Sequence, residues 1–184
     1  SITTVTLSAA ASVNEGGSLV YTASVNNAVT GAPLVVTLSN GATITIPVGA
    51  TSATSSPIAV RADDAYAQGN QNLTVSISGT TGGNYESLNT TSTATTVVSD
   101  NGTVTTVSLS AAANVSEGGT VVYSASVSNA VTGTPLVINL SNGAAITIPV
   151  GSTSGTSAPV AVRADDAYVQ GNQTLNVGIS STSG

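Results

Sequence analysis

The sequence predicts an all-β protein made of tandem sandwich domains with about seven strands each. Three observations favour this fold class. A long stretch of sequence occurs twice, apolar residues alternate with Ser and Thr, and no segment has the 3.6-residue apolar period and caps of a helix. Because every second residue of such a strand faces the core, the pattern predicts two packed sheets in each domain.

The repeat is the longest-range feature of the sequence. The run TVTLSAAASVNEGGSLVY begins at Thr4 and returns 102 residues later, at Thr106, as TVSLSAAANVSEGGTVVY. Residues 4–82 and 106–184 share 58 identities in 79 positions. This period is too long for a solenoid coil and matches a whole sandwich domain. We expect one domain over residues 1–100, a short linker at 101–102 and a second domain over 103–184.

The second copy contains no counterpart of residues 83–100, because Gly184 aligns with Gly82. These residues supply the last expected strand of the first domain, and a sandwich without that strand has an unpaired sheet edge. We interpret the chain as a section of a longer array. Either the domain frame is permuted, or a neighbouring repeat or another copy completes the sheet.

Alternation locates the strands within a repeat. Five runs have apolar residues at every second position, and the residues expected to face the core are Tyr21, Ala23, Val25, Leu34, Val36, Leu38, Ile44, Ile46, Val48, Ile58, Val60, Leu73, Val75 and Ile77. Asn40-Gly41 lies between two of these runs and recurs as Asn142-Gly143. This dipeptide predicts a two-residue hairpin turn in which both positions have positive φ.

Composition excludes several classes of function. The formal charge is −6, with two Arg and no Lys, so binding to nucleic acid or to an anionic membrane surface is not expected. No apolar run is long enough to span a bilayer and no signal peptide is visible, so we expect a soluble segment without membrane insertion. Without Cys no disulfide can form, and a metal ion is the obvious alternative clamp outside a cell.

Catalysis is not expected either. The chain has no His, Cys or Lys, which removes most pairs of nucleophile and base. Asp63 and Asp64 are adjacent, so on a regular strand their carboxylates would point to opposite faces and would not act together on one bond.

The acidic residues fall into a repeated pattern. The chain has eight, and each repeat places one in EGG and two in RADDAY, while another ends the expected last strand of the first repeat. Loops at one end of a Greek-key sandwich can bring such residues together, and carboxylate oxygens are the ligands that Ca²⁺ prefers. We therefore expect Ca²⁺ near these residues, with the candidate ligands Glu15, Asp63, Asp64, Asp100, Glu117, Asp165 and Asp166. Glu86 stands apart, and the sequence leaves open whether it pairs with Arg61 or with nothing. Arg61 directly precedes the acidic pair and is expected to balance it.

Three segments carry a resemblance to a known family: NEGGSLVYTASV, SNGATITIPVGATSATSSPIAVRADDAYAQGNQNLTVSIS and GGNYESL…TTVVSD. They resemble the extender repeats of large RTX adhesins. These are the LapA-like biofilm adhesins that Gram-negative bacteria export through type I secretion systems. The resemblance covers essentially the whole chain. It implies Ig-like Greek-key sandwiches in long extracellular arrays that project an adhesive tip from the cell surface. It also implies that Ca²⁺ at or near the domain junctions stiffens the array.

A more distant similarity is to Calx-β domains. That resemblance implies Ca²⁺ ligands at the Glu of the first loop, at an Asp pair and at an Asp ending the last strand. The matching residues are Glu15, Asp63, Asp64 and Asp100, with Glu117, Asp165 and Asp166 in the second repeat. Where the Calx-β pattern has further acids, this chain has Gln68, Asn70 and Gln71, which implies fewer ions or weaker binding.

The expected function is a non-catalytic spacer whose partners are the neighbouring repeats of the same chain. Two alternatives belong to other classes. A Thr-rich and Asn-rich face is compatible with a glycan-binding or ice-binding module. The incomplete second repeat is compatible with a filament or surface-layer subunit whose sheet edge is filled by a strand of another copy.

Overall fold

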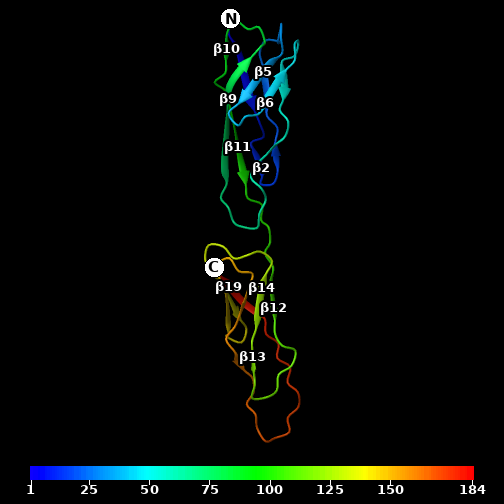
Figure 1. Cartoon of the computed structure of the whole chain (residues 1–184), viewed down its shortest axis with the longest axis vertical. Coiled ribbons are helices and arrows are strands. Elements are labelled where there is room, and N and C mark those ends of the chain that lie inside the picture. The colour runs from blue at the N-terminus through cyan, green and yellow to red at the C-terminus, as the bar shows by residue number, and fades with distance from the viewer. The chain divides into compact units, whose positions relative to one another are not determined.

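The computed structural model describes every residue from Ser1 to Gly184. It consists of strands, turns and loops, and contains no helix with the length and apolarity of a membrane span. Backbone contacts divide the chain into two compact units, Ser1–Gly102 and Thr103–Gly184. We call them unit 1 and unit 2 (Figure 1). The all-β prediction is confirmed.

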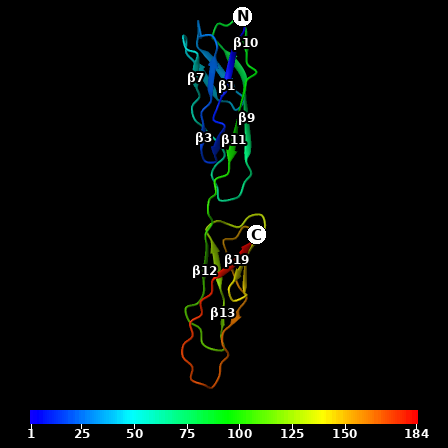
Figure 2. The same cartoon turned by 180° about the vertical axis from the view of Figure 1, so that it is seen from behind.

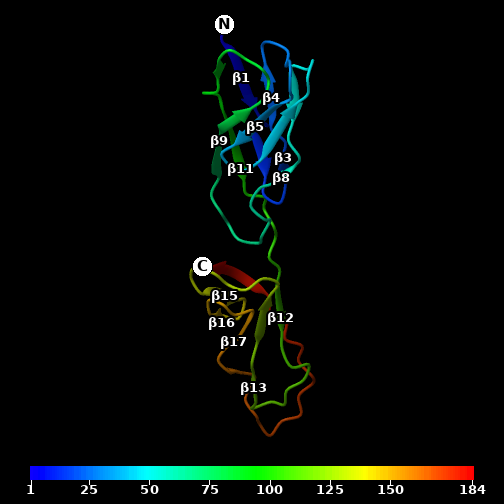
Figure 3. The ribbon, with the colours of Figure 1, turned by 45° about the horizontal axis from the view of Figure 1, so that its top comes forward.

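Unit 1 is a sandwich of two main sheets (Figures 1 and 3). The first has the order β10-β1-β4-β7, with strands at Leu88–Asn89, Thr3–Ser8, Thr22–Val25 and Ser52–Thr54. The second has the order β2-β11-β9-β5-β6, with strands at Ser12–Asn14, Thr93–Ser99, Gln71–Thr81, Leu34–Leu38 and Thr43–Ile46. A short additional pair consists of β3 (Ser18–Leu19) and β8 (Ile58–Ala59). Figure 2 shows β1, β3 and β7 from the opposite side.

Strand β11 lies inside the second sheet, between β2 and β9. It pairs antiparallel with the first half of β9, residues 71–76, and parallel with β2. The second half of β9 pairs instead with β5. Alternate residues of β11 point between the sheets, so Ala94, Thr96 and Val98 are all buried. The last strand of the repeat is therefore part of the core as well as part of the sheet.

The core of unit 1 follows the predicted alternation closely. Leu34, Val36, Ile44 and Ile46 are completely buried, and Thr or Ser separates most of the inward residues. Full burial of such a side chain contributes about 1.5–3 kcal/mol. The prediction for Val48 is wrong, because this residue is 52% exposed. Strand β6 ends at Ile46, and the turn that follows carries Val48 away from the sheet.

The hairpin between β5 and β6 has a longer turn than the sequence predicts. Gly41 has φ +85°, but Asn40 does not have positive φ. The Gly41 N–H donates to the Leu38 carbonyl at 2.9 Å, and the Leu38 N–H donates to the Ala42 carbonyl at 2.8 Å. These bonds define a three-residue loop that ends in a left-handed glycine. The Asn40 side chain stabilises it by accepting the Ala42 N–H.

Unit 2 repeats part of this architecture. It has two three-stranded sheets, β12-β14-β17 and β16-β15-β19, and a short pair β13-β18. The bounds are Val107–Ser110, Thr120–Val121, Ser124–Val127, Leu136–Leu140, Ala145–Ile148, Ser154–Thr156, Val160–Ala161 and Ile179–Ser183 for β12 to β19. Ile138, Ile146 and Ile148 form the centre of its core. Residues 114–116 and 173–178, which align with β2 and the first half of β9, form no strand.

Candidate functional site at the acidic end of each unit

Three loops far apart in the sequence meet at one end of unit 1, where the chain leaves β11 (Figure 3). The Glu15 N–H donates to the Ser99 carbonyl at 2.9 Å, and the Gly16 N–H donates to the Arg61 carbonyl at 2.8 Å. Gly16 has φ +75°, and a Cβ there would lie 2.9 Å from the Cβ of Asp63. A glycine at this position therefore lets the EGG and RADD loops approach each other.

Glu15 is buried and paired with an arginine. Its residue exposure is 3%, and its Oε2 accepts a hydrogen bond from Arg61 Nε at 3.0 Å. Arg61 also donates from Nη1 to the Gly69 carbonyl at 2.8 Å, which fixes the 62–70 loop. Glu15 Oε1 and Arg61 Nη2 are buried without a hydrogen-bond partner. The pair satisfies the charge of a buried carboxylate, as such burial requires.

The sequence did not identify this pairing. We expected Arg61 to balance Asp63 and Asp64, but its ion pair is with Glu15. Glu86, whose partner the sequence left open, accepts instead from the amino group of Ser1 at 2.6 Å. One signal could have indicated the pairing: both Arg of the chain occur at equivalent positions, each accompanied by the Glu of an EGG loop.

Two further acids of unit 1, Asp64 and Asp100, accept hydrogen bonds from Gln68. Asp100 Oδ2 accepts the Gln68 backbone N–H at 2.7 Å. Asp64 Oδ2 accepts from the Gln68 side-chain amide, and Asp64 Oδ1 accepts the Tyr66 N–H at 2.9 Å. Gln68 thus joins the loop of the Asp pair to the end of β11. The sequence singled out Gln68 only as a departure from an acidic pattern, not as the residue that connects these acids.

Unit 2 reproduces the part of this arrangement that its residues allow. Arg163 Nε lies 3.3 Å from Glu117 Oε2, and Arg163 Nη1 donates to the Gly171 carbonyl at 3.0 Å. Asp166 accepts from Gln170 and Tyr168, as Asp64 does in unit 1. The Glu117 and Arg163 side chains are 27% and 34% exposed, against 0% and 21% for Glu15 and Arg61. Asp165 is exposed, and no residue of unit 2 corresponds to Asp100.

Unit 1 brings Glu15, Asp63, Asp64 and Asp100 to one end, with hard oxygen ligands of the type that Ca²⁺ prefers. The structure contains no group of three or more acidic side chains arranged to hold an ion together. Asp64 and Asp100 are engaged by Gln68, and one Glu15 oxygen by Arg61. Glu15, Asp64 and Asp100 are therefore held by donors of Arg61 and Gln68 and do not form a ligand shell.

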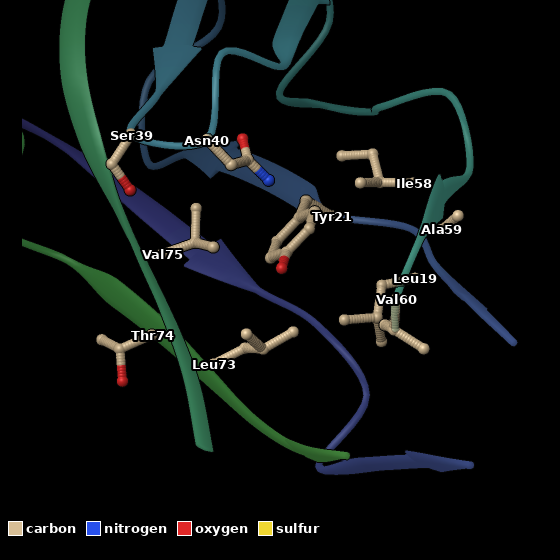
Figure 4. Close-up of a pocket in the computed structure, with 10 residues that line it drawn as sticks. All are labelled: Leu19, Tyr21, Ser39, Asn40, Ile58, Ala59, Val60, Leu73, Thr74 and Val75. Atoms are coloured by element: carbon tan, nitrogen blue, oxygen red, sulfur yellow. The ribbon is translucent and has the colours of Figure 1, made fainter. Parts of the chain in front are cut away.

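A separate hollow lies between the sheets of unit 1 and has no acidic lining (Figure 4). Its volume is about 320 Å³, and Leu19, Tyr21, Leu73 and Val75 line it. Burial raises the pKa of Tyr21 above its ordinary value of 10.0. The lining is mostly apolar, so the hollow continues the core and brings together no set of catalytic groups.

The model of the LapA domain family matches residues 1–101 and again residues 103–184. Searches of curated proteins and of solved structures found no match. This family indicates an adhesin-related role in cell adhesion at the cell surface, and a structural rather than an enzymatic one. With one match over each of its two repeats, the chain belongs to the LapA domain family.

Proposed function

We propose that the chain is a non-catalytic spacer in the extender region of a giant RTX adhesin. Tandem Ig-like sandwiches would hold an adhesive tip away from the bacterial surface for attachment and biofilm formation. The observation that carries this proposal is that both matches to the family cover copies of the same sandwich, which has no Cys and few charged residues. Each unit has its own apolar core, as expected for a series of separate domains.

We propose further that Ca²⁺ binds at the acidic end of unit 1. Support comes from the meeting of three loops there and from the unpartnered, buried Oε1 of Glu15. Asp64 and Asp100 both bind Gln68, which keeps the two carboxylates within reach of one short loop. To act as ligands, Asp64 and Asp100 must exchange the Gln68 donors for the ion. A bound ion would supply the positive charge that these donors now provide only in part.

The consequence of such binding concerns the segment that leaves unit 1. Asp100 directly precedes Asn101 and Gly102, the last residues of the unit. When Asp100 is fixed to the loop of the Asp pair, the segment that follows it leaves unit 1 in one direction. When it is released, Asp63, Asp64 and Asp100 repel one another and the exit becomes less constrained. The stiffness of the array would then depend on Ca²⁺.

The test compares thermal unfolding and small-angle scattering with Ca²⁺ and with chelator. A ligand that binds only the folded state at a hundredfold excess over Kd adds about 2.7 kcal/mol of stability. We expect unit 1 to gain more than unit 2, which lacks a residue equivalent to Asp100, and scattering to report a longer particle with Ca²⁺. Identical curves in Ca²⁺ and in chelator would remove the metal proposal and leave the spacer proposal intact.

Two variants sharpen this test. Gln68→Glu replaces the amide donor with a fifth acid, so stability in chelator falls and the increase caused by Ca²⁺ grows. Asp100→Asn removes one charge, and the increase caused by Ca²⁺ shrinks. Glu86→Gln is the matched control, because Glu86 lies outside the three acidic loops and its side chain is 80% exposed. Equal responses of all three variants to Ca²⁺ would contradict the proposed ligands.

A further inference from the structure

Two segments of unit 1, residues 3–15 and 87–99, run side by side and in the same direction. We call them the terminal segments. Strand β1 pairs parallel with β10, and β2 pairs parallel with β11. The offset between partners is 85 residues in both pairs, with Thr3 opposite Leu88 at one end of the unit. The first and last strands of the unit therefore keep one register over its whole length.

Hydrogen bonds outside the regular ladders also connect the terminal segments. They are Thr3 N–H to the Ser87 carbonyl at 3.0 Å, Leu7 N–H to Ser92 Oγ at 3.0 Å, Thr96 Oγ1 to the Ala10 carbonyl at 2.6 Å, Val97 N–H to the Ala11 carbonyl at 2.9 Å and Glu15 N–H to the Ser99 carbonyl at 2.9 Å. The bonds are spread along both segments. Thr96 is buried, so water does not compete for its bond.

The two terminal segments meet the rest of the chain at opposite ends of unit 1 (Figures 1 and 2). Strand β1 begins near the first residue of the unit, and β11 ends near the last. A pull on the chain at these two points therefore draws β1 and β11 in opposite directions along their own length. Because ladder hydrogen bonds lie across the strands, such sliding loads many of them at once, whereas peeling breaks them one after another.

The other neighbours of the terminal strands oppose the same movement. Strand β1 pairs antiparallel with β4, and β11 pairs antiparallel with β9. Each of the two strands thus lies between two partners and neither is at an edge of its sheet. A lengthwise pull must therefore slide each strand past both of its neighbours.

We propose that the terminal segments form a mechanical clamp that lets unit 1 carry tension between its ends without unfolding. Resistance to a pull is set by the rate of unfolding, so the clamp acts on the barrier and not only on the equilibrium stability. The inference rests on the proposed spacer role for the source of the tension, because an attached tip pulls on the chain that holds it. It does not depend on Ca²⁺.

The test pulls on unit 1 within the 184-residue chain in two directions. The chain has no Cys, so introduced cysteines are unique attachment points. Ser1→Cys with Gly102→Cys loads the clamp lengthwise, whereas Asn14→Cys with Gly102→Cys peels β11 from β2 at the end that the two strands share. All three positions are exposed. Single-molecule force spectroscopy at one fixed Ca²⁺ concentration should give a rupture force at least about twofold higher for the lengthwise pull.

Thr96→Val and Ile44→Val are matched variants, because both replace a buried residue and both should lower stability in chemical denaturation. Only Thr96 bonds to the opposite terminal segment, and Ile44 lies in β6, outside the clamp. Under a constant lengthwise force, Thr96→Val should speed unfolding about fivefold, the factor equivalent to one hydrogen bond. Ile44→Val should leave this rate unchanged.

Equal rupture forces in the two directions would overturn the clamp, and so would equal acceleration by the two variants. Either result would leave the spacer proposal in place, since a spacer can hold a tip at a distance without resisting a strong pull. Conversely, evidence against the spacer role would not alter the measured forces.

Discussion

The substitution Arg61→Met should destabilise unit 1 far more than Arg163→Met destabilises unit 2. Both Arg side chains pair with the Glu of an EGG loop through Nε, and both donate from Nη1 to a glycine carbonyl eight residues later. They differ in how deeply the carboxylate is buried. The Glu15 side chain is 0% exposed, whereas the Glu117 side chain is 27% exposed.

The expected magnitude follows from that difference. Removing one partner of a buried pair leaves an uncompensated charge and costs about 3–5 kcal/mol. An exposed pair contributes about 0–1 kcal/mol. Because the whole stability of a domain is about 5–15 kcal/mol, Arg61→Met should remove a large part of the stability of unit 1. For a domain of this size the melting temperature falls by about 4–8 °C per kcal/mol, so the shift is on the order of 20 °C.

Calorimetry measures the shift, and hydrogen exchange assigns it to a unit through the core strands β5 and β15. The double variant Glu15→Leu with Arg61→Met separates the charge from the rest of the arginine, since replacing both ions by apolar groups is often neutral. The double variant should therefore recover most of the loss. Equal losses for Arg61→Met and Arg163→Met would contradict a loss caused by an unpaired buried carboxylate. A double variant as unstable as Arg61→Met alone would contradict it too.

Two further substitutions test the core of unit 1. Burial raises the pKa of the Tyr21 hydroxyl, so the folded state keeps its proton to higher pH than the unfolded chain. The contribution of the protonated hydroxyl to the free energy of unfolding is complete below the ordinary pKa of 10.0. It is lost as pH rises through the higher pKa of the folded state. Tyr21→Phe should therefore reduce the loss of stability at alkaline pH, measured by denaturant unfolding at a series of pH values. Thr96 Oγ1 donates to the Ala10 carbonyl at 2.6 Å, so Thr96→Val should cost about 1 kcal/mol in chemical denaturation. Thr95→Val on the exposed face of β11 should change stability little, and equal losses would contradict this account.

The sequence predicted the fold class and the side of each strand that faces the core, because alternation with period 2 is a direct consequence of strand geometry. Val36 and Ile44 are examples, since both are buried where alternation places them. The failure at Val48 has a local cause. Alternation continues through Pro47, but the strand does not, so the last apolar residue of the run lies outside the sheet.

Other features depend on partners that no local pattern reveals. Arg61 pairs with Glu15, not with Asp63 or Asp64, because Glu15 is the acid buried where its loop bonds to Ser99. This burial is a tertiary property. The role of Gln68 likewise depends on the approach of β11 to the 62–70 loop. The Asn40-Gly41 dipeptide marked the hairpin correctly, but the register of β5 and β6 decided the length of the turn.

The two copies show how strongly a strand depends on its neighbour. Residues 71–76 form a strand and residues 173–178 do not, although Gln, Leu and Val recur at equivalent positions. Asn176 and Gly178 replace Thr74 and Ser76 and lower the β propensity somewhat. Residues 114–116 form no strand either, although they retain Val115 at the centre. The equivalent segments of unit 1 are separate in sequence, and what they share is pairing with β11. Strand formation at both sites of unit 1 therefore depends on one shared neighbour as well as on local sequence.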